Sequence, residues 1–317
     1  MTSNVLVTGA AGFIGSWTCE ALAAAGHSVL GIDNFNPYYD VNLKRARAQR
    51  LKDKVRIIEG DISDRAAVDG IFKENRIDQV CHLAAQAGVR NSIDNPYVYE
   101  SANNGGTLNL LEACRHHGVM SFVLASSSSV YGGNKKIPFS VLDPVDRPIS
   151  LYAATKKYNE LLGHSYHHLF GIHCTALRFF TVYGPWGRPD MALFKFARAI
   201  LADEPIDVYN QGKMKRDFTY VTDIVAGILA AMDKNYPYEI FNLGNSKTVD
   251  LAYFIECIEK ELGKKAKKNL LPMQPGDVPE TFADIELSRQ KLGFSPKISI
   301  EQGIREFISW YKTYHGR

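Results

Sequence analysis

Short runs of β-branched residues alternate with longer segments of helical period along the first half of this chain. Six runs are predicted to be strands: Asn4–Thr8, Ser28–Asp33, Val55–Glu59, Gln79–Leu83, Ser121–Ser126 and His173–Arg178. Five segments between them are predicted to be helices: Phe13–Ala25, Val41–Leu51, Arg65–Lys73, Tyr97–His117 and Leu151–Phe170. Parallel strands need crossover helices of this kind, so the alternation predicts an α/β fold with a doubly wound parallel sheet.

The rhythm changes after Arg178, where a segment rich in glycine and proline is followed by a helical segment near Ala192–Ala202 and short strands. We therefore expect two domains, residues 1–180 with the parallel sheet and residues 181–317 as a smaller C-terminal α/β domain. Residues 218–243 again read as a helix followed by a strand. We expect this segment to return to the first sheet.

The charge balance of the 317 residues is nearly even, with Lys+Arg 37 against Asp+Glu 34 and a formal net charge of +3. No global field favours nucleic acid or an anionic membrane, and no continuous apolar stretch approaches membrane-spanning length. The five widely spaced cysteines indicate buried thiols in a reducing cytoplasm. The histidines at 164, 167 and 168 lack the carboxylates or cysteines of a metal site, so no metal is expected.

A glycine-rich turn, Gly9-Ala10-Ala11-Gly12-Phe13-Ile14-Gly15, directly follows the first predicted strand and begins a helix. Glycines let the backbone approach a pyrophosphate, whose charge then faces the free N–H groups of the helix. Asp33 ends the second strand, where a carboxylate accepts hydrogen bonds from an adenosine ribose and repels a 2′-phosphate. The next three residues, Asn34, Phe35 and Asn36, bring no basic side chain to neutralise such a phosphate, so NAD is favoured over NADP. The cofactor is also expected to contact the residues after the third and fourth strands: Asp61, Ile62, Leu83, Ala84 and Ala85.

Tyr152 and Lys156 stand four residues apart at the start of a predicted helix, so they project from the same face. An ammonium group beside a phenol favours the phenolate, and lowering its pKa from about 10 to about 7 requires roughly 4 kcal/mol. Tyr152 would then act as a general base towards a substrate hydroxyl. The run Ser126–Ser129 ends the fifth strand at the ligand-binding edge of the sheet, where a hydroxyl can relay a proton.

These parts together resemble an extended short-chain dehydrogenase/reductase, the NAD-dependent epimerase/dehydratase family, over essentially the whole chain. The family combines Gly-x-x-Gly-x-x-Gly, a strand-end hydroxyl and Tyr-x-x-x-Lys on a Rossmann-type fold. The resemblance implies that Ser127 is the catalytic hydroxyl and that Lys156 also binds the nicotinamide ribose. It further implies a homodimer in which the helices near residues 97–117 and 151–170 pair across a two-fold axis.

Three longer segments, residues 85–90, 177–191 and 212–218, resemble the UDP-glucuronate 4-epimerases within that family. Such enzymes interconvert UDP-glucuronate and UDP-galacturonate through a 4-keto intermediate, with NAD recycled. The resemblance implies that Arg216 binds the UDP diphosphate and Asp277 the uridine ribose. It also implies that further residues surround the sugar and its carboxylate: Gln86, Arg90, Ser128, Ser129, Thr181 and Arg188.

Other functions stay open at this point. Dehydratases and decarboxylases of the family carry an acid near the catalytic hydroxyl, whereas this chain has Ser128 and Ser129. Epimerisation is therefore favoured over decarboxylation of UDP-glucuronate. A 4-epimerase of UDP-glucose or UDP-N-acetylglucosamine, and a non-catalytic module that senses NAD, are the remaining alternatives.

Overall fold

A central parallel sheet of seven strands organises the computed structural model, which describes residues 2–274 and 278–316. Its order is β10-β6-β5-β4-β1-β2-β3, and every neighbouring pair is parallel. The strands are β1 (Asn4–Thr8), β2 (Ser28–Asp33), β3 (Arg56–Glu59), β4 (Gln79–His82), β5 (Ser121–Ser127), β6 (His173–Phe179) and β10 (Tyr238–Leu243). The strand order reverses beside β1, which confirms the predicted doubly wound, Rossmann-like sheet.

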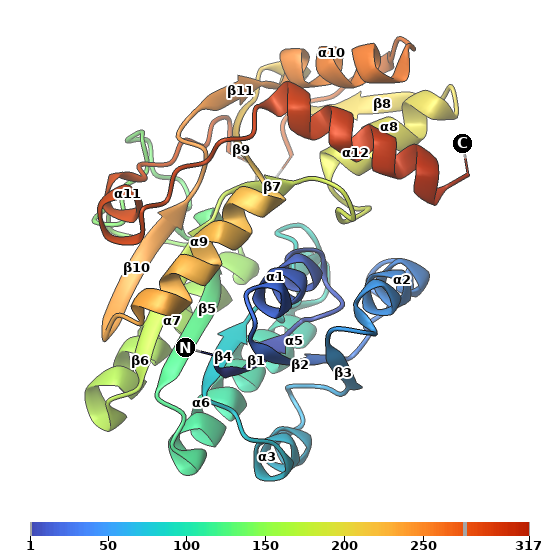
Figure 1. The fold of residues 1–317 in the computed structure, drawn as a ribbon. Coiled ribbons are helices and arrows are strands. Elements are labelled where there is room, and N and C mark those ends of the chain that lie inside the picture. Colours follow the sequence, from blue (N-terminus) through green and yellow to red (C-terminus); the bar gives the residue numbers. More distant parts are fainter. Residues whose placement is uncertain (1, 275–277, 317) are drawn as a thin grey trace.

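Helices cover both faces of this sheet (Figure 1). On one face α1 (Phe13–Ala24) packs against α9 (Val221–Lys234) and α2 (Val41–Leu51). On the other, α6 (Gly106–His117) packs between α3 (Arg65–Glu74) and α7 (Leu151–Phe170). Two hydrophobic clusters of buried residues lie between the sheet and its helices, as expected when both faces of a parallel sheet are buried.

A smaller group of elements gathers at one end of the sheet, at the top of Figure 1. It has a three-stranded sheet of β7 (Thr181–Tyr183), β9 (Lys215–Tyr220) and β11 (Thr248–Asp250), and a two-stranded one of β8 (Pro205–Val208) and β12 (Lys267–Leu270). The helices of this part of the chain are α8 (Ala192–Leu201), α10 (Leu251–Leu262), α11 (Glu286–Leu292) and α12 (Ile300–Tyr314). Between β9 and β11 the chain returns to the large sheet, because β10 pairs with β6.

The segment predicted as one helix over Tyr97–His117 is helical throughout, but it is not one regular α-helix. It runs without a break through α5 (Pro96–Tyr99), a π-helical segment, Glu100–Gly105, and α6, and the short α4 (Asn91–Asp94) precedes it. The wider π turn lies where the buried Asn103 side chain bonds to both backbone polar groups of Gln86. Gly106 is needed for close packing, because a Cβ there would lie 2.6 Å from the Ile62 side chain.

Candidate active site

A cavity of about 580 Å³ lies where the strands of the large sheet end. Its wall is built from the loops after β1, β2, β3, β4, β5 and β6 together with residues of the smaller group of elements. The sequence-predicted residues that line it are Gly9, Gly12, Phe13, Ile14, Gly15, Asp33, Asn34, Asp61, Ile62, Leu83, Ala84, Ala85, Gln86, Ser127, Ser128, Ser129, Tyr152, Lys156, Thr181, Arg188 and Arg216. Segments separated by up to two hundred residues in the chain thus meet in one site.

The exposed Arg90 does not line the cavity; its guanidinium carbon lies 4.9 Å from the ring centre of Tyr209. Asp277 lies outside the described residues.

The glycine-rich turn is held against β2 and leaves no room for side chains. Gly9 has φ +71°, a conformation that favours glycine, and its N–H donates to the Ile32 carbonyl at 2.8 Å. A Cβ on Gly15 would lie 2.0 Å from the Gly9 carbonyl oxygen. The backbone at the start of α1 therefore borders the cavity directly, as a site for a pyrophosphate requires.

Asp33 is buried at the end of β2. Its carboxylate accepts hydrogen bonds from the backbone N–H groups of Ala11 at 3.0 Å and Phe35 at 2.8 Å. Burial raises the pKa of Asp33, while the charge of Lys44 and these N–H groups lower it. Next to it, Asn34 donates to Asp61 at 2.8 Å, which joins the loops after β2 and β3.

The three catalytic candidates come together at the junction of β5 and α7. Lys156 is buried, and its Nζ donates to the Ala125 carbonyl at 2.7 Å and lies 6.0 Å from the Tyr152 ring centre. The Ser127 Oγ accepts from the Ser129 N–H at 3.2 Å and from the Ser129 hydroxyl at 2.9 Å. Because both donors come from Ser129, the single O–H of Ser127 remains for Tyr152 or a substrate.

At Tyr152 and Lys156, burial and nearby charges shift the pKa in opposite directions. Burial raises the pKa of Tyr152, and the charge of Arg188 and a hydrogen bond with Ser127 oppose that shift. Burial lowers the pKa of Lys156 to about 8, and the charge of Glu160 opposes it. The charge of Arg188, on the loop between β7 and α8, thus favours the phenolate of Tyr152, which the Tyr-x-x-x-Lys motif did not indicate.

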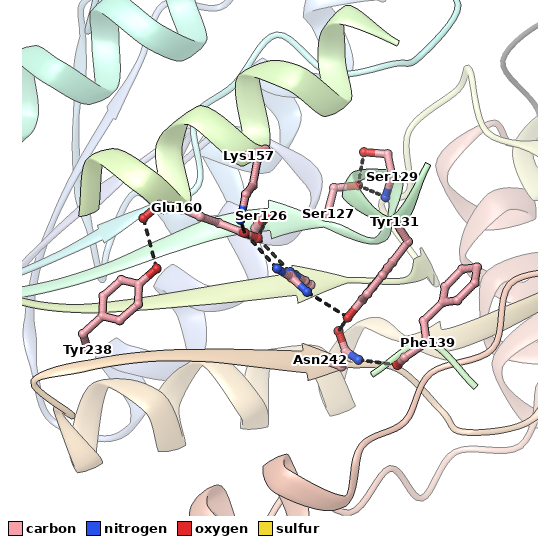
Figure 2. A network of polar contacts seen from close by, with 10 residues as sticks. Ser126, Ser127, Ser129, Tyr131, Phe139, Lys157, Glu160, Tyr238 and Asn242 are labelled. Carbon is pink, nitrogen blue, oxygen red and sulfur yellow. Dashed lines mark hydrogen bonds and ion pairs between the residues drawn. The ribbon is translucent and has the colours of Figure 1, made fainter. Parts of the chain in front are cut away.

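A buried polar network fixes the catalytic helix to the sheet (Figure 2). Glu160, one turn after Lys156, accepts from the Ser126 hydroxyl at 2.6 Å and from Arg178 at 2.8 and 2.9 Å. Arg178 also donates to the Tyr131 hydroxyl at 3.1 Å, which donates to Asn242 at 2.6 Å. Residues 126, 178 and 242 are in register on three adjacent strands, so the network sets the position of α7 relative to the end of β5.

Sequence reasoning missed two cations on α2. Lys44 lines the cavity, and Arg47 is fully buried behind the glycine-rich turn, where it donates to the Ala11 carbonyl at 3.2 Å. Both lie on the same helical face as the buried Leu51, at positions that an apolar stripe would normally occupy. The sequence did hold a signal for these two residues, because charged residues stand at core-facing positions of a short helix.

The described residues contain no cluster of three or more His, Cys, Asp or Glu side chains able to hold a metal ion. Within that same part of the chain, no helix is long and apolar enough to cross a membrane. All five cysteines are buried free thiols.

Comparisons with known proteins identify the family of this chain. The profile of the NAD dependent epimerase/dehydratase family matches residues 5–244. An uncharacterized protein of Methanocaldococcus jannaschii is 54% identical over 97% of this chain and 96% of its own length. UDP-glucuronate 4-epimerase 1 of Arabidopsis thaliana is 46% identical over 99% of this chain and 77% of that protein.

Solved structures show the same likeness in three dimensions. UDP-glucuronic acid 4-epimerase from Bacillus cereus, in complex with UDP-glucuronic acid and NAD, superposes with a TM-score of 0.91 at 37% identity. The match covers 98% of this chain and 99% of that chain. UDP-glucose 4-epimerase from Thermotoga maritima, with UDP-glucose, gives a TM-score of 0.90 at 30% identity over 98% and 99%. From its profile match, its relatives and its fold, the chain belongs to the NAD-dependent epimerase/dehydratase family.

Proposed function

We infer that this chain is a UDP-glucuronate 4-epimerase, which interconverts UDP-glucuronate and UDP-galacturonate with retained NAD. The observation that carries this inference is the cavity that brings together the glycine-rich turn, the Ser127, Tyr152 and Lys156 group, and the hydroxyl side chains of Ser128, Ser129 and Thr181. Relatives named UDP-glucuronate 4-epimerase, 44–47% identical to this chain, support the choice of substrate. The cofactor is NAD.

The residues expected to hold NAD are the glycine-rich turn, Asp33 with Asn34, and the loops from Asp61 and Leu83. NAD, when bound, accepts the C4 hydride and returns it. Tyr152, as the phenolate, would take the proton of the C4 hydroxyl as the carbon is oxidised. It would return that proton to the same oxygen when hydride is added back to the other face of the turned 4-keto sugar. Ser127 donates a hydrogen bond to the same oxygen, and Lys156 holds a positive charge beneath it.

Substrate recognition needs two kinds of groups. Arg216, with Asp277 from outside the described residues, is expected to bind the uridine diphosphate, because a guanidinium pairs well with phosphate oxygens. Hydroxyls at Ser128, Ser129 and Thr181, with Gln86 and Arg188, would surround the glucuronate carboxylate. Holding that carboxylate matters chemically, since a 4-keto hexuronate is a β-keto acid and loses carbon dioxide readily.

We expect NAD binding and sugar binding to be carried by different parts of the chain. Residues 1–180, joined by residues 218–243, would form the NAD-binding domain, and the rest of residues 181–317 would bind the nucleotide sugar. Catalysis would occur between them, in the cavity that both Tyr152 and Arg188 line.

Separate incubations with UDP-glucuronate and UDP-glucose, followed by NMR of the C4 protons, test this function. We expect UDP-galacturonate from the first and a turnover at least about ten times lower with the second, because a site built to bind a charged group discriminates strongly against its absence. Release of carbon dioxide or formation of a UDP-pentose would identify a decarboxylase instead. Preferred turnover of UDP-glucose would place the chain among the UDP-glucose epimerases.

We also propose that the enzyme is a homodimer in the cytoplasm. Exposed apolar side chains gather on the α5 to α7 side of the molecule: Tyr97, Val98, Leu108, Leu151, Tyr158, Leu161 and Leu169. Pairing of these helices with those of a second copy would bury that apolar surface. The buried, unpaired thiols suit a reducing compartment.

Leu161→Glu is expected to convert the dimer to a monomer in analytical ultracentrifugation, because it places a charge on this apolar face. Leu161 is 55% exposed in the single chain, so the folded monomer tolerates the carboxylate. Leu142→Glu is the matched control, since Leu142 is 90% exposed and lies on the loop before α7, outside that set of residues. A Leu161→Glu protein that still sediments as a dimer would exclude this face as the interface.

A further inference from the structure

The segment that leads from β7 to Arg188 has a strained backbone. Trp186 has φ +63° and Gly184 φ +140°, and the Gly187 N–H closes the turn by donating to the Gly184 carbonyl at 3.1 Å. A left-handed conformation is rare for a bulky residue such as tryptophan and costs about 1–3 kcal/mol. Something outside the segment must therefore hold it.

The buried Arg47 side chain makes that contact. Its Nε and Nη2 donate to the Trp186 carbonyl at 3.0 and 2.6 Å, and Nη2 donates to the Gly187 carbonyl at 3.1 Å. Its Nη1 donates to the Ala11 carbonyl of the glycine-rich turn at 3.2 Å and to the Tyr39 hydroxyl at 2.6 Å. One guanidinium thus ties the cofactor side of the cavity to the strained segment.

Aromatic side chains add to these contacts, which together clamp residues 185–187. The Trp17 Nε1 of α1 donates to the Pro185 carbonyl at 3.0 Å. The Trp186 ring packs against Trp310 and Tyr314 of α12, with ring centres 5.2 and 5.3 Å apart. Packing of the Trp186 ring does not by itself fix the backbone conformation. The hydrogen bonds to the carbonyls of residues 185–187 do, because they are directional.

Arg188 follows this segment directly. Its guanidinium lines the cavity and pairs with Asp190, with Nε donating at 3.0 Å. Asp190 in turn accepts from the Tyr38 hydroxyl at 3.3 Å. Tyr152 and the hydroxyl side chains of Ser128 and Thr181 line the same cavity as Arg188. The charge of Arg188 also opposes the rise in the pKa of Tyr152 that burial causes.

We propose that Arg47 is a positioning residue for substrate selection: by clamping residues 185–187 to the glycine-rich turn, it aims Arg188 at the carboxylate of the sugar. This proposal rests on the proposed function, since it takes the carboxylate as the group selected. Arg47 itself touches neither the sugar nor the reacting atoms.

Hydrogen–deuterium exchange tests the clamp without any substrate. In Arg47→Met, which keeps the length of the side chain and removes its donors, we expect peptide 184–191 to exchange at least about ten times faster, as local opening replaces the lost bonds. Arg45→Met is the matched control, because Arg45 lies on the same helix with its side chain 58% exposed. Its contacts, to Glu59 at 3.6 Å and to the Phe35 ring centre at 4.8 Å, do not involve residues 184–191. Exchange that is the same in Arg47→Met, Arg45→Met and wild type would overturn the proposal.

A double-mutant cycle then tests whether Arg47 acts through Arg188. The measured quantity is the ratio of kcat/KM for UDP-glucuronate to that for UDP-glucose. We expect this ratio to fall at least about ten-fold in Arg47→Met and in Arg188→Met, with no more than about a two-fold further fall in the double variant. Additive losses, or an unchanged ratio in Arg47→Met, would show that Arg47 only stabilises the fold.

Two further measurements keep these outcomes separate. If Arg47→Met does not fold, Trp17→Phe removes the hydrogen bond to Pro185 and keeps an aromatic ring beside Arg50. We expect a smaller change, about three-fold, in exchange and in the ratio; no change in either would contradict the proposal. A wild-type enzyme with no turnover of UDP-glucuronate would refute the proposed function, while the exchange experiment would still decide whether Arg47 holds the segment.

Discussion

Tyr152→Phe is expected to leave NAD bound and to lower kcat by about 10³-fold or more, since it removes the group that moves the proton of the C4 hydroxyl. The ring of Tyr152 packs at right angles to Tyr99, with ring centres 6.2 Å apart, and phenylalanine retains that contact. NAD content is measured by releasing the cofactor from the purified protein, and kcat by NMR of the C4 epimers.

Tyr253→Phe is the control for this change. Tyr253 lies on α10 and its hydroxyl donates to Glu301 of α12, and neither residue lines the cavity, so full activity is expected. If Tyr152→Phe turned over normally, the proton would have to move through another group, and the mechanism would be wrong. Loss of NAD from the variant would instead assign the hydroxyl to cofactor binding.

Gly15→Ala is expected to produce a protein without NAD and without activity. The new Cβ would lie 2.0 Å from the Gly9 carbonyl oxygen, 2.8 Å from its carbon and 3.2 Å from the Ala10 Cα, all backbone atoms of the glycine-rich turn. Backbone cannot yield as a side chain can, so the turn must open, and the pyrophosphate site opens with it. Released cofactor per chain, measured after purification, gives the result.

Gly70→Ala is the matched control, because it makes the same chemical change at a helical glycine of α3 with no atom within 4 Å of the new Cβ. We expect it to retain NAD and to gain about 0.5–1 kcal/mol in free energy of unfolding from the better helix former. A Gly15→Ala protein with one NAD per chain would contradict the role given to the turn.

The sheet and several helices could be predicted because local chemistry marks their ends. Helix α7 has its predicted bounds: the Ser150 hydroxyl accepts from the Ala153 N–H at its start, and Gly171 ends it with φ +72°. The π-helical segment before α6 could not be predicted, since it depends on the bonds between Asn103 and the backbone of Gln86, which lies 17 residues earlier.

The catalytic group and the cofactor turn were accessible to sequence reasoning because each is a short motif at a strand end. The residues that orient them were not. Glu160 meets Arg178, and Arg47 meets Trp186, only through tertiary packing, across 18 and 139 residues of chain. No periodic pattern in the sequence encodes such pairings. The division into an NAD-binding domain and a sugar-binding domain stays a prediction, because it too depends on how distant segments pack.

UDP-glucuronate deuterated at C4 tests the central claim, hydride removal and return at one carbon, most directly. Incubated with the purified enzyme in ordinary water and followed by NMR, it is predicted to give UDP-galacturonate that retains its deuterium at C4, with no carbon dioxide released. Loss of the label to solvent, or a labelled UDP-pentose, would contradict the account.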